Sequence, residues 1–245
     1  MALRPLPYAD GQRLEVAGAP VRLRVSARAR RVSLRIDSRR REVIATAPSL
    51  RRLAEAAAFA AERATWMAQQ LAALPRPADL AALETLRLFG EPHGVERRGL
   101  RAQITAATDT GPAKLVLPAD PDRAPAALAR LLKRHAQEIL AARTAVYCGR
   151  LARPVPPVSV MDARTRWGSC KPPTPRTAAS IRYSWRLALA PFAVADYVAA
   201  HECAHLIEAN HSPRFWAVVK SLCGDPKPHR AWLRTHGAEL HSFGR

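Results

Sequence analysis

The chain has 245 residues, of which 48% are hydrophobic, and its formal net charge is +19. This length and composition are sufficient for a large buried core in one large or two small domains. Because no apolar stretch reaches the roughly 18 residues that a membrane-spanning helix needs, we expect no contact with a membrane. The first residues, Met1 to Pro7, lack the apolar core of a signal peptide, so the sequence predicts a cytoplasmic protein.

Nearly all of the positive charge comes from arginine, and lysine is rare. A strongly basic chain is typical of proteins that contact nucleic acid or anionic surfaces. Abundant arginine, alanine and proline together are also what a GC-rich coding bias produces, without any nucleic-acid function. Nucleic acid is therefore a candidate partner, and the sequence leaves both explanations open.

Residues 21–46 alternate apolar and polar side chains as strands do. Val21, Leu23 and Val25 alternate with arginines, and the alternation continues through 32–36 and 43–45. This pattern predicts a small antiparallel sheet with one apolar face and one face rich in guanidinium groups. The guanidinium face is either a solvated outer surface or a phosphate-binding surface.

A helix is predicted from Ser49, a candidate N-cap, to about Leu74, where Pro75 ends it. Three short strands are predicted after it, at 85–89, 102–105 and 114–117. The proline-bounded segment 118–125 has the composition of a linker. We therefore expect an N-terminal β-rich subdomain over residues 1–118, containing the long helix at about 50–74, and a second domain over residues 119–245.

The second domain is predicted to start with a long backing helix over 124–149. Strands are predicted after it, at 158–162, 165–170 and 178–183. Further helices are predicted to begin near Pro191 and near Asp225. The expected fold class is α+β.

The motif H-E-x-x-H-x5-H occupies residues 201–211 and is the most informative part of the sequence. Residues four apart lie on one face of a helix, so His201 and His205 can direct imidazole nitrogens at the same ion. Glu202 lies about 100° further round the helix, where a carboxylate can take a proton from a metal-bound water. The motif predicts a catalytic zinc site.

The third histidine imposes a requirement on the backbone. If the helix continued past His205, His211 would lie about 9 Å further along the axis and could not reach the same ion. Asn210 tolerates the left-handed conformation that ends helices, and Ser212-Pro213 has the pattern of an N-cap followed by the first residue of a new helix. The sequence therefore predicts a helix break that returns His211 to the first pair.

Three histidines hold one Zn2+ ion and leave a fourth position for water, whereas structural zinc sites usually fill all four positions. The cysteines are scattered without C-x-x-C spacing, at Cys148, Cys170, Cys203 and Cys223. We therefore expect reduced thiols and no four-cysteine zinc site.

Three strings resemble the YgjP-like zinc metallopeptidase domain family: R-W-G-S-C at 166–170, I-R-Y-S-W-R-L at 181–187, and the histidine motif with its continuation H-S-P-R-F-W at 211–216. The resemblance extends from about residue 20 to about residue 240. It implies a zincin-like fold, with His201, His205 and His211 as zinc ligands and Glu202 as the catalytic residue. The family is similar to the SprT-like and WLM metallopeptidases, some of which act on proteins attached to DNA.

The chain departs from the family pattern at Cys203, where the family usually has an apolar residue, and at Ser184, where it usually has asparagine. Neither position is a ligand or the base, so the departures concern packing and hydrogen bonding around the site. Metzincins place glycine where this chain has Glu208, and they place a methionine turn downstream, where this chain has no methionine. Glu239 is the alternative third ligand, as in gluzincins.

A second group that polarises the substrate would assist catalysis, and the sequence offers Arg166, Tyr183, Arg182, His229 and His236 without choosing among them. The expected function is a zinc metallopeptidase in which Glu202 activates the zinc-bound water. The alternatives are a zinc hydrolase of a non-peptide bond, such as a nucleotide phosphoanhydride, and an arginine-rich nucleic-acid-binding protein with structural zinc. We expect a monomer that acts on a peptide or protein substrate.

Overall fold

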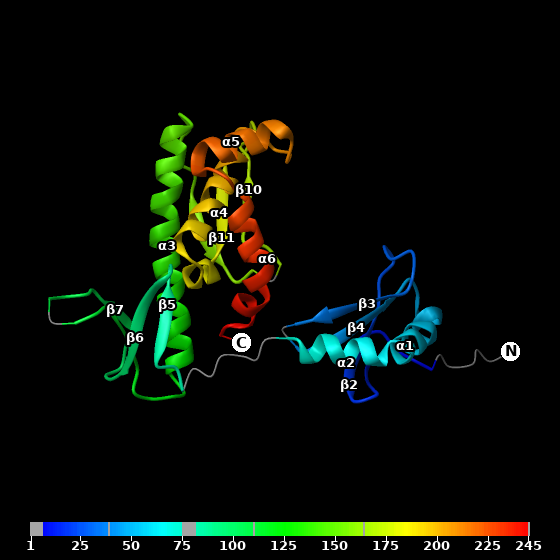
Figure 1. The fold of residues 1–245 in the computed structure, drawn as a ribbon. Coiled ribbons are helices and arrows are strands. Elements are labelled where there is room, and N and C mark those ends of the chain that lie inside the picture. Colours follow the sequence, from blue (N-terminus) through cyan, green and yellow to red (C-terminus); the bar gives the residue numbers. More distant parts are fainter. Residues whose placement is uncertain (1–6, 39, 75–81, 110, 164, 245) are drawn as a thin grey trace. The chain divides into compact units, whose positions relative to one another are not determined.

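The computed structural model describes residues 7–244 apart from residues 39, 75–81, 110 and 164 (Figure 1). The described residues form two compact units, 7–74 and 82–244. Among them, none of the helices combines the length and the apolar character that a membrane crossing requires.

The N-terminal unit contains a four-stranded sheet in the order β1-β2-β4-β3. Its strands are β1 (Arg13–Val16), β2 (Ala19–Val25), β3 (Ser33–Asp37) and β4 (Glu42–Ala47). β4 pairs parallel with β2 and antiparallel with β3, so the sheet is mixed and the prediction of an antiparallel sheet was wrong. β4 is almost fully buried and lies in the sheet between β2 and β3. The chain therefore crosses from β2 to the edge strand β3 and then returns through a hairpin to β4. Alternation of side chains predicts strands but not this order.

Two helices, α1 (Leu53–Glu62) and α2 (Ala64–Ala72), lie where one long helix was predicted. The helical path is interrupted at Arg63, whose φ and ψ are −104° and 21°. Ser49 is the N-cap residue of a 3-10 turn (Leu50–Arg52) that leads into α1, as its predicted position implies, but its side chain makes no capping hydrogen bond. The buried side chains of α1 pack against β2 and β4 and form the core of this unit.

Glu42 is a buried residue, with 4% of its surface exposed, and its carboxylate links the strands of this sheet. Arg13 donates to Glu42 Oε2 over 3.2 Å, and Arg40 lies 3.7 Å from Oε1. Arg22 Nε lies 2.9 Å from Oε1, in ion-pair contact but without hydrogen-bond geometry. Part of the arginine-rich surface predicted from the sequence is therefore neutralised within the unit.

The second unit begins with another four-stranded sheet, in the order β5-β6-β8-β7. Its strands are β5 (Thr85–Leu88), β6 (Glu91–Arg97), β7 (Gln103–Thr105) and β8 (Lys114–Leu117). The sequence predicted three of these and missed β6, because Pro92 and Gly94 are both unfavourable in strands. A turn at Gly90, where φ is 91°, joins β5 to β6.

This sheet shares one core with the rest of the second unit. Leu88 and Leu115 pack in the same cluster as Leu128 of the long helix α3 (Ala124–Arg150). The turn after β5 is also fixed by backbone bonds, from Phe89 N–H to the Ala188 carbonyl at 2.7 Å and from Phe192 N–H to the Phe89 carbonyl at 2.9 Å. The boundary between the two compact units therefore lies before β5, whereas the sequence predicted a domain boundary at residue 118.

The remaining elements include α4 (Phe192–Ala204), the helix that carries the start of the histidine motif. The others are β9 (Val158–Met161), β10 (Gly168–Lys171), β11 (Ser180–Ser184), α5 (Pro213–Cys223) and α6 (Lys227–Ser242). The sheet order is β10-β11-β9, so β10 is an edge strand. In Figure 1, α4 lies between α3 and α6, and it also packs against β10 and α5.

Polar contacts fix α4 to the backing helix α3. Asp196 of α4 accepts hydrogen bonds from Arg143 and, over 2.7 Å, from the Tyr147 hydroxyl. Thr144 of α3 shares a hydrogen bond of 2.9 Å with the Tyr183 hydroxyl of β11. These contacts hold the motif helix in a defined position against the core.

The buried carboxylate of Glu42 leads to a test of the N-terminal unit. We expect Glu42→Gln to lower the local free energy of unfolding by about 2 kcal/mol, because charge-assisted contacts to a buried group are lost. Hydrogen exchange of the β2 and β4 amides, followed by mass spectrometry, measures this change in the N-terminal unit alone. Glu55→Gln is the control: it removes a fully exposed pair with Arg52 and should leave protection nearly unchanged. Equal protection in the two variants would contradict the role of Glu42.

Candidate metal centre

The structure brings the three histidines of the motif together. His201 lies in the last turn of α4, His205 caps its end, and His211 lies just before α5. One nitrogen of each ring lies within 4.8 Å of the others, and His201 Nε2 is 3.1 Å from His211 Nε2. A tetrahedral ion with zinc–nitrogen bonds of about 2.0–2.1 Å separates its ligand nitrogens by roughly 3.4 Å, so small ring rotations suffice to hold one ion.

The helix break lies earlier than the sequence predicted. α4 ends at Ala204, and the chain then turns through backbone bonds from Leu206 to Cys203 and from Ile207 to Ala204, each 3.0 Å long. Asn210 does not have a positive φ, so its predicted left-handed conformation was wrong.

The predicted start of the next helix is confirmed. Ser212 is the N-cap of α5, and its hydroxyl accepts a hydrogen bond of 3.2 Å from the Phe215 N–H. Pro213 occupies the first helical position, as the sequence predicted. The turn after α4 and this cap together return His211 to the first two histidines.

Hydrogen bonds orient the rings for metal binding. His205 Nδ1 lies 3.1 Å from the Glu208 carbonyl oxygen, and because a carbonyl only accepts, Nδ1 carries the proton and Nε2 keeps its lone pair. His201 Nδ1 lies 3.4 Å from the Tyr197 hydroxyl. Burial, with the neighbouring His205, His211 and Arg230, lowers the pKa of His201 to about 3, so the ring is neutral as a ligand must be.

The Phe215 ring packs against all three imidazoles. Its side chain is fully buried, and its ring centroid lies 4.9 Å from that of His201, 4.5 Å from that of His205 and 4.8 Å from that of His211. The Phe215 ring offers no ligand atom, so the three imidazoles are the donors on this side. The donor set therefore fits a zinc ion with an open coordination position.

Glu202 lies between α4 and β10 and is 5% exposed. A Cβ atom added to Gly168 would lie 2.4 Å from Glu202 Oε1, so only glycine leaves room for the carboxylate. Burial raises the pKa of Glu202 to about 7, against the opposing effects of the Cys170 N–H and the charge of Arg166. The sequence contained Gly168 in the R-W-G-S-C string, but no pattern in the chain linked it to Glu202.

A pocket of about 210 Å³ joins the carboxylate to the first histidine. It is lined by Arg166, Trp167, Gly168, Tyr197, Val198, His201, Glu202 and Leu233. The Tyr197 hydroxyl lies near His201, and helical periodicity does not predict this contact.

Of the candidates for a second polarising group, Arg166 is the one that lines this pocket. Tyr183 is fully buried and bonded to Thr144, and burial raises its pKa well above the ordinary value. His229 stacks on Tyr197 with ring centroids 5.7 Å apart. His236 donates from Nδ1 to the Trp232 carbonyl, and Arg182 is an exposed residue of β11.

Glu239, the alternative third ligand, lies on α6 beside Trp232 and His236 in another pocket. Among the described residues, it does not belong to the group of donors that includes the three histidines. All four cysteines are free, as expected.

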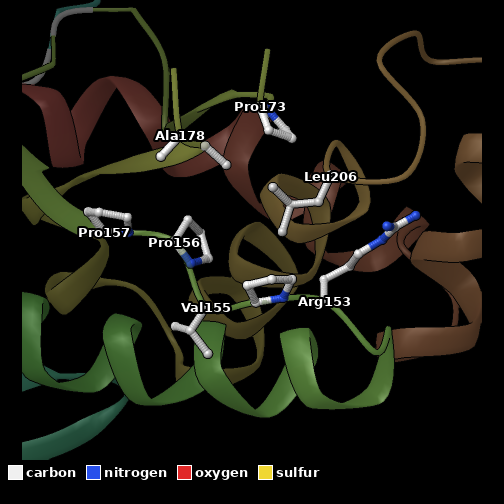
Figure 2. A pocket seen from close by; sticks show the side chains of 9 residues that line it. Arg153, Val155, Pro156, Pro157, Pro173, Ala178 and Leu206 are labelled. Atoms are coloured by element: carbon white, nitrogen blue, oxygen red, sulfur yellow. The ribbon is translucent and has the colours of Figure 1, made fainter. Parts of the chain in front are cut away.

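A second cavity, of about 420 Å³, is lined in part by Leu206, the residue after His205. Figure 2 shows Leu206 and several prolines around it, with the Arg153 side chain at one side. Its walls are mainly apolar and come from the segment after α3 and from the loop between β10 and β11.

A family model described as "YgjP-like, metallopeptidase domain" matches residues 30–236, which is most of the chain. No curated protein and no solved structure gives a significant match.

The third ligand can be tested by metal retention. We expect His211→Ala to lower the zinc affinity by at least about 100-fold, more than the loss of an outer-shell partner usually costs. Chelator competition followed by elemental analysis of the dialysed protein measures this. Glu239→Ala should retain zinc like the wild type, and zinc loss in that variant with retention in His211→Ala would transfer the role to Glu239.

Proposed function

The chain belongs to the YgjP-like metallopeptidase family, and from that premise we propose that it is a zinc peptidase in which His201, His205 and His211 hold one ion and Glu202 transfers the proton. The observation that carries the proposal is the convergence of three ring nitrogens, together with a pocket that His201, one of the three, shares with the buried carboxylate of Glu202.

The ligand set supports zinc over other common ions. Imidazole suits zinc, whereas calcium and magnesium prefer oxygen ligands. Three neutral rings also leave the open position that a catalytic site needs. When bound, zinc would polarise the substrate carbonyl and bring the pKa of a coordinated water near 7.

Glu202 is proposed to act as both base and acid. Its carboxylate accepts a proton from the water that attacks the carbonyl carbon, as the new carbon–oxygen bond forms. The same carboxyl then gives that proton to the amine nitrogen, as the carbon–nitrogen bond breaks. Gly168 and the Cys170 N–H hold the carboxylate at the pocket wall. Arg166 lines the same pocket, and we propose it as the group that contacts the substrate's carbonyl oxygen.

Two features support a peptide as the substrate. β10, which carries Gly168 beside Glu202, is an edge strand, so an extended peptide can pair with its outer side. The apolar cavity beside Leu206 suits an apolar side chain (Figure 2). A nucleoside triphosphate needs several cationic groups around its phosphates, and Arg166 is the one cationic residue among those lining the pocket of Glu202.

The role of Glu202 is tested by Glu202→Gln. We expect the variant to retain zinc and to lose peptidase activity by about 10²–10⁴-fold, because the amide cannot accept the proton. Casein hydrolysis and zinc content are measured on the same preparations, together with phosphate release from nucleoside triphosphates.

Phosphate release by the wild type without casein cleavage would favour the nucleotide hydrolase. Unchanged hydrolysis of every substrate in Glu202→Gln would remove Glu202 from the mechanism.

Gly168 provides a separate test of the carboxylate position. In Gly168→Ala the new methyl group displaces Glu202, and we expect kcat to fall by about 100-fold while zinc is retained. Gly94→Ala is the matched control, because a Cβ atom there meets no other atom within 4 Å. The prediction fails if both alanine variants keep wild-type turnover.

A further inference from the structure

The N-terminal unit has a hollow of about 480 Å³ along the edge of its sheet. One wall is the start of β3 and the residues before it, and the other is the helical layer. The lining residues are Arg31, Val32, Ser33, Leu34, Phe59, Arg63 and Trp66. We call this hollow the β3 groove.

The β3 groove lies where the sheet lacks a further strand. β3 is the last strand in its order and pairs with β4 on one side, within the described part of the chain. α1 packs on β2 and β4, and α2 reaches β3. An edge strand presents unpaired N–H and C=O groups, so its outer side is a template for one more strand.

The helical wall of the β3 groove carries two aromatic side chains and one arginine and is solvent-accessible. Phe59, Arg63 and Trp66 are spaced four and three residues apart and share one side of the helical layer. Trp66 is 38% exposed, which is unusual for a large aromatic residue in a unit of this size. Val32 and Leu34 are half-buried, so a strand added here would cover apolar surface on both walls.

The charge of the β3 groove is positive. Arg31 and Arg63 lie at its walls, and neither forms an ion pair with any described residue. None of the residues that line the groove is acidic. Glu55 pairs with Arg52 and Glu42 pairs with three arginines, while Glu62 at the end of α1 is exposed and does not line the groove. The groove therefore complements an acidic segment.

We propose that the β3 groove binds an extended acidic polypeptide by strand addition. The backbone of that peptide pairs with the outer side of β3, its apolar side chains cover Phe59 and Trp66, and its carboxylates pair with Arg31 and Arg63. This site requires no metal and is separate from the proposed peptidase function.

The contacts of the β3 groove favour a peptide over single-stranded nucleic acid. The Arg63 guanidinium lies 5.5 Å from the centroid of the Phe59 ring and covers a face that a base would need for stacking. A strand edge offers donors and acceptors at the spacing of another peptide backbone, not of phosphates.

The same charges disfavour a second copy of the chain. Pairing of β3 with β3 of another molecule would bring Arg31 and Arg35 of both copies close together, and like charges on paired strands repel.

The test uses the full-length Glu202→Gln chain, which keeps a peptide probe intact, so that failure of this proposal is distinguishable from failure of the proposed catalysis. A fluorescein-labelled peptide of alternating Glu and Val is titrated by fluorescence anisotropy. We expect a Kd on the order of 10 μM and at least about 10-fold weaker binding of the matching Lys-Val peptide and of a backbone N-methylated Glu-Val peptide.

Variants assign the binding to the β3 groove. Trp66→Ala and Arg63→Gln should each raise the Kd at least about 10-fold, because aromatic and arginine side chains dominate such interfaces. Arg51→Ala is the control, since Arg51 is exposed and does not line the groove. Circular dichroism checks that each variant is folded.

Several results would overturn the proposal. They are equal binding of the Lys-Val or N-methylated peptide, no binding of the Glu-Val peptide up to about 1 mM, and unchanged binding in both groove variants. Tighter binding of a thymidine oligonucleotide that is lost in Trp66→Ala would identify a nucleic-acid site instead. A dimer that dissociates in Trp66→Ala would identify a second copy as the occupant.

Discussion

The candidate centre depends on one backbone constraint: α4 must end at its second histidine so that the chain can bring His211 back to His201. The turn after Ala204 and the Ser212 cap of α5 produce this return. Phe215, one turn into α5, then packs against all three imidazoles. The same helix start therefore positions the third ring and supplies the apolar wall beneath the cluster. Without the early end of α4, the three nitrogens could not converge.

The adjacent side chains of His201 and Glu202 must point in different directions, and the packing of α4 allows both orientations. The histidine faces its two partners, whereas the carboxylate points into the contact with β10. This arrangement requires α4 and β10 to approach closely, which glycine at position 168 permits. The contacts of Asp196 with α3 hold α4 in place from its other side. The position of the carboxylate is thus a property of the whole packed unit.

The sequence predicted the parts that depend on local spacing. The helical face shared by His201 and His205, the Ser212-Pro213 start of α5 and the long helix α3 are all encoded within a few turns of chain. The parts it missed depend on distant contacts. Pro92 and Gly94 concealed β6, which is stabilised by pairing with β5 and β8. The parallel pairing of β2 with β4, the fit of Gly168 against Glu202 and the contact of Tyr197 with His201 join residues whose proximity no short pattern expresses.

In the proposed site three imidazoles hold one zinc ion and leave a position open. X-ray absorption at the zinc edge of the purified, zinc-loaded protein tests it most directly, because it reports the type and distance of each ligand atom. We expect three nitrogen neighbours with the scattering of imidazole at about 2.0–2.1 Å, together with one further light atom. A sulfur neighbour near 2.3 Å, or a fourth imidazole, would contradict it.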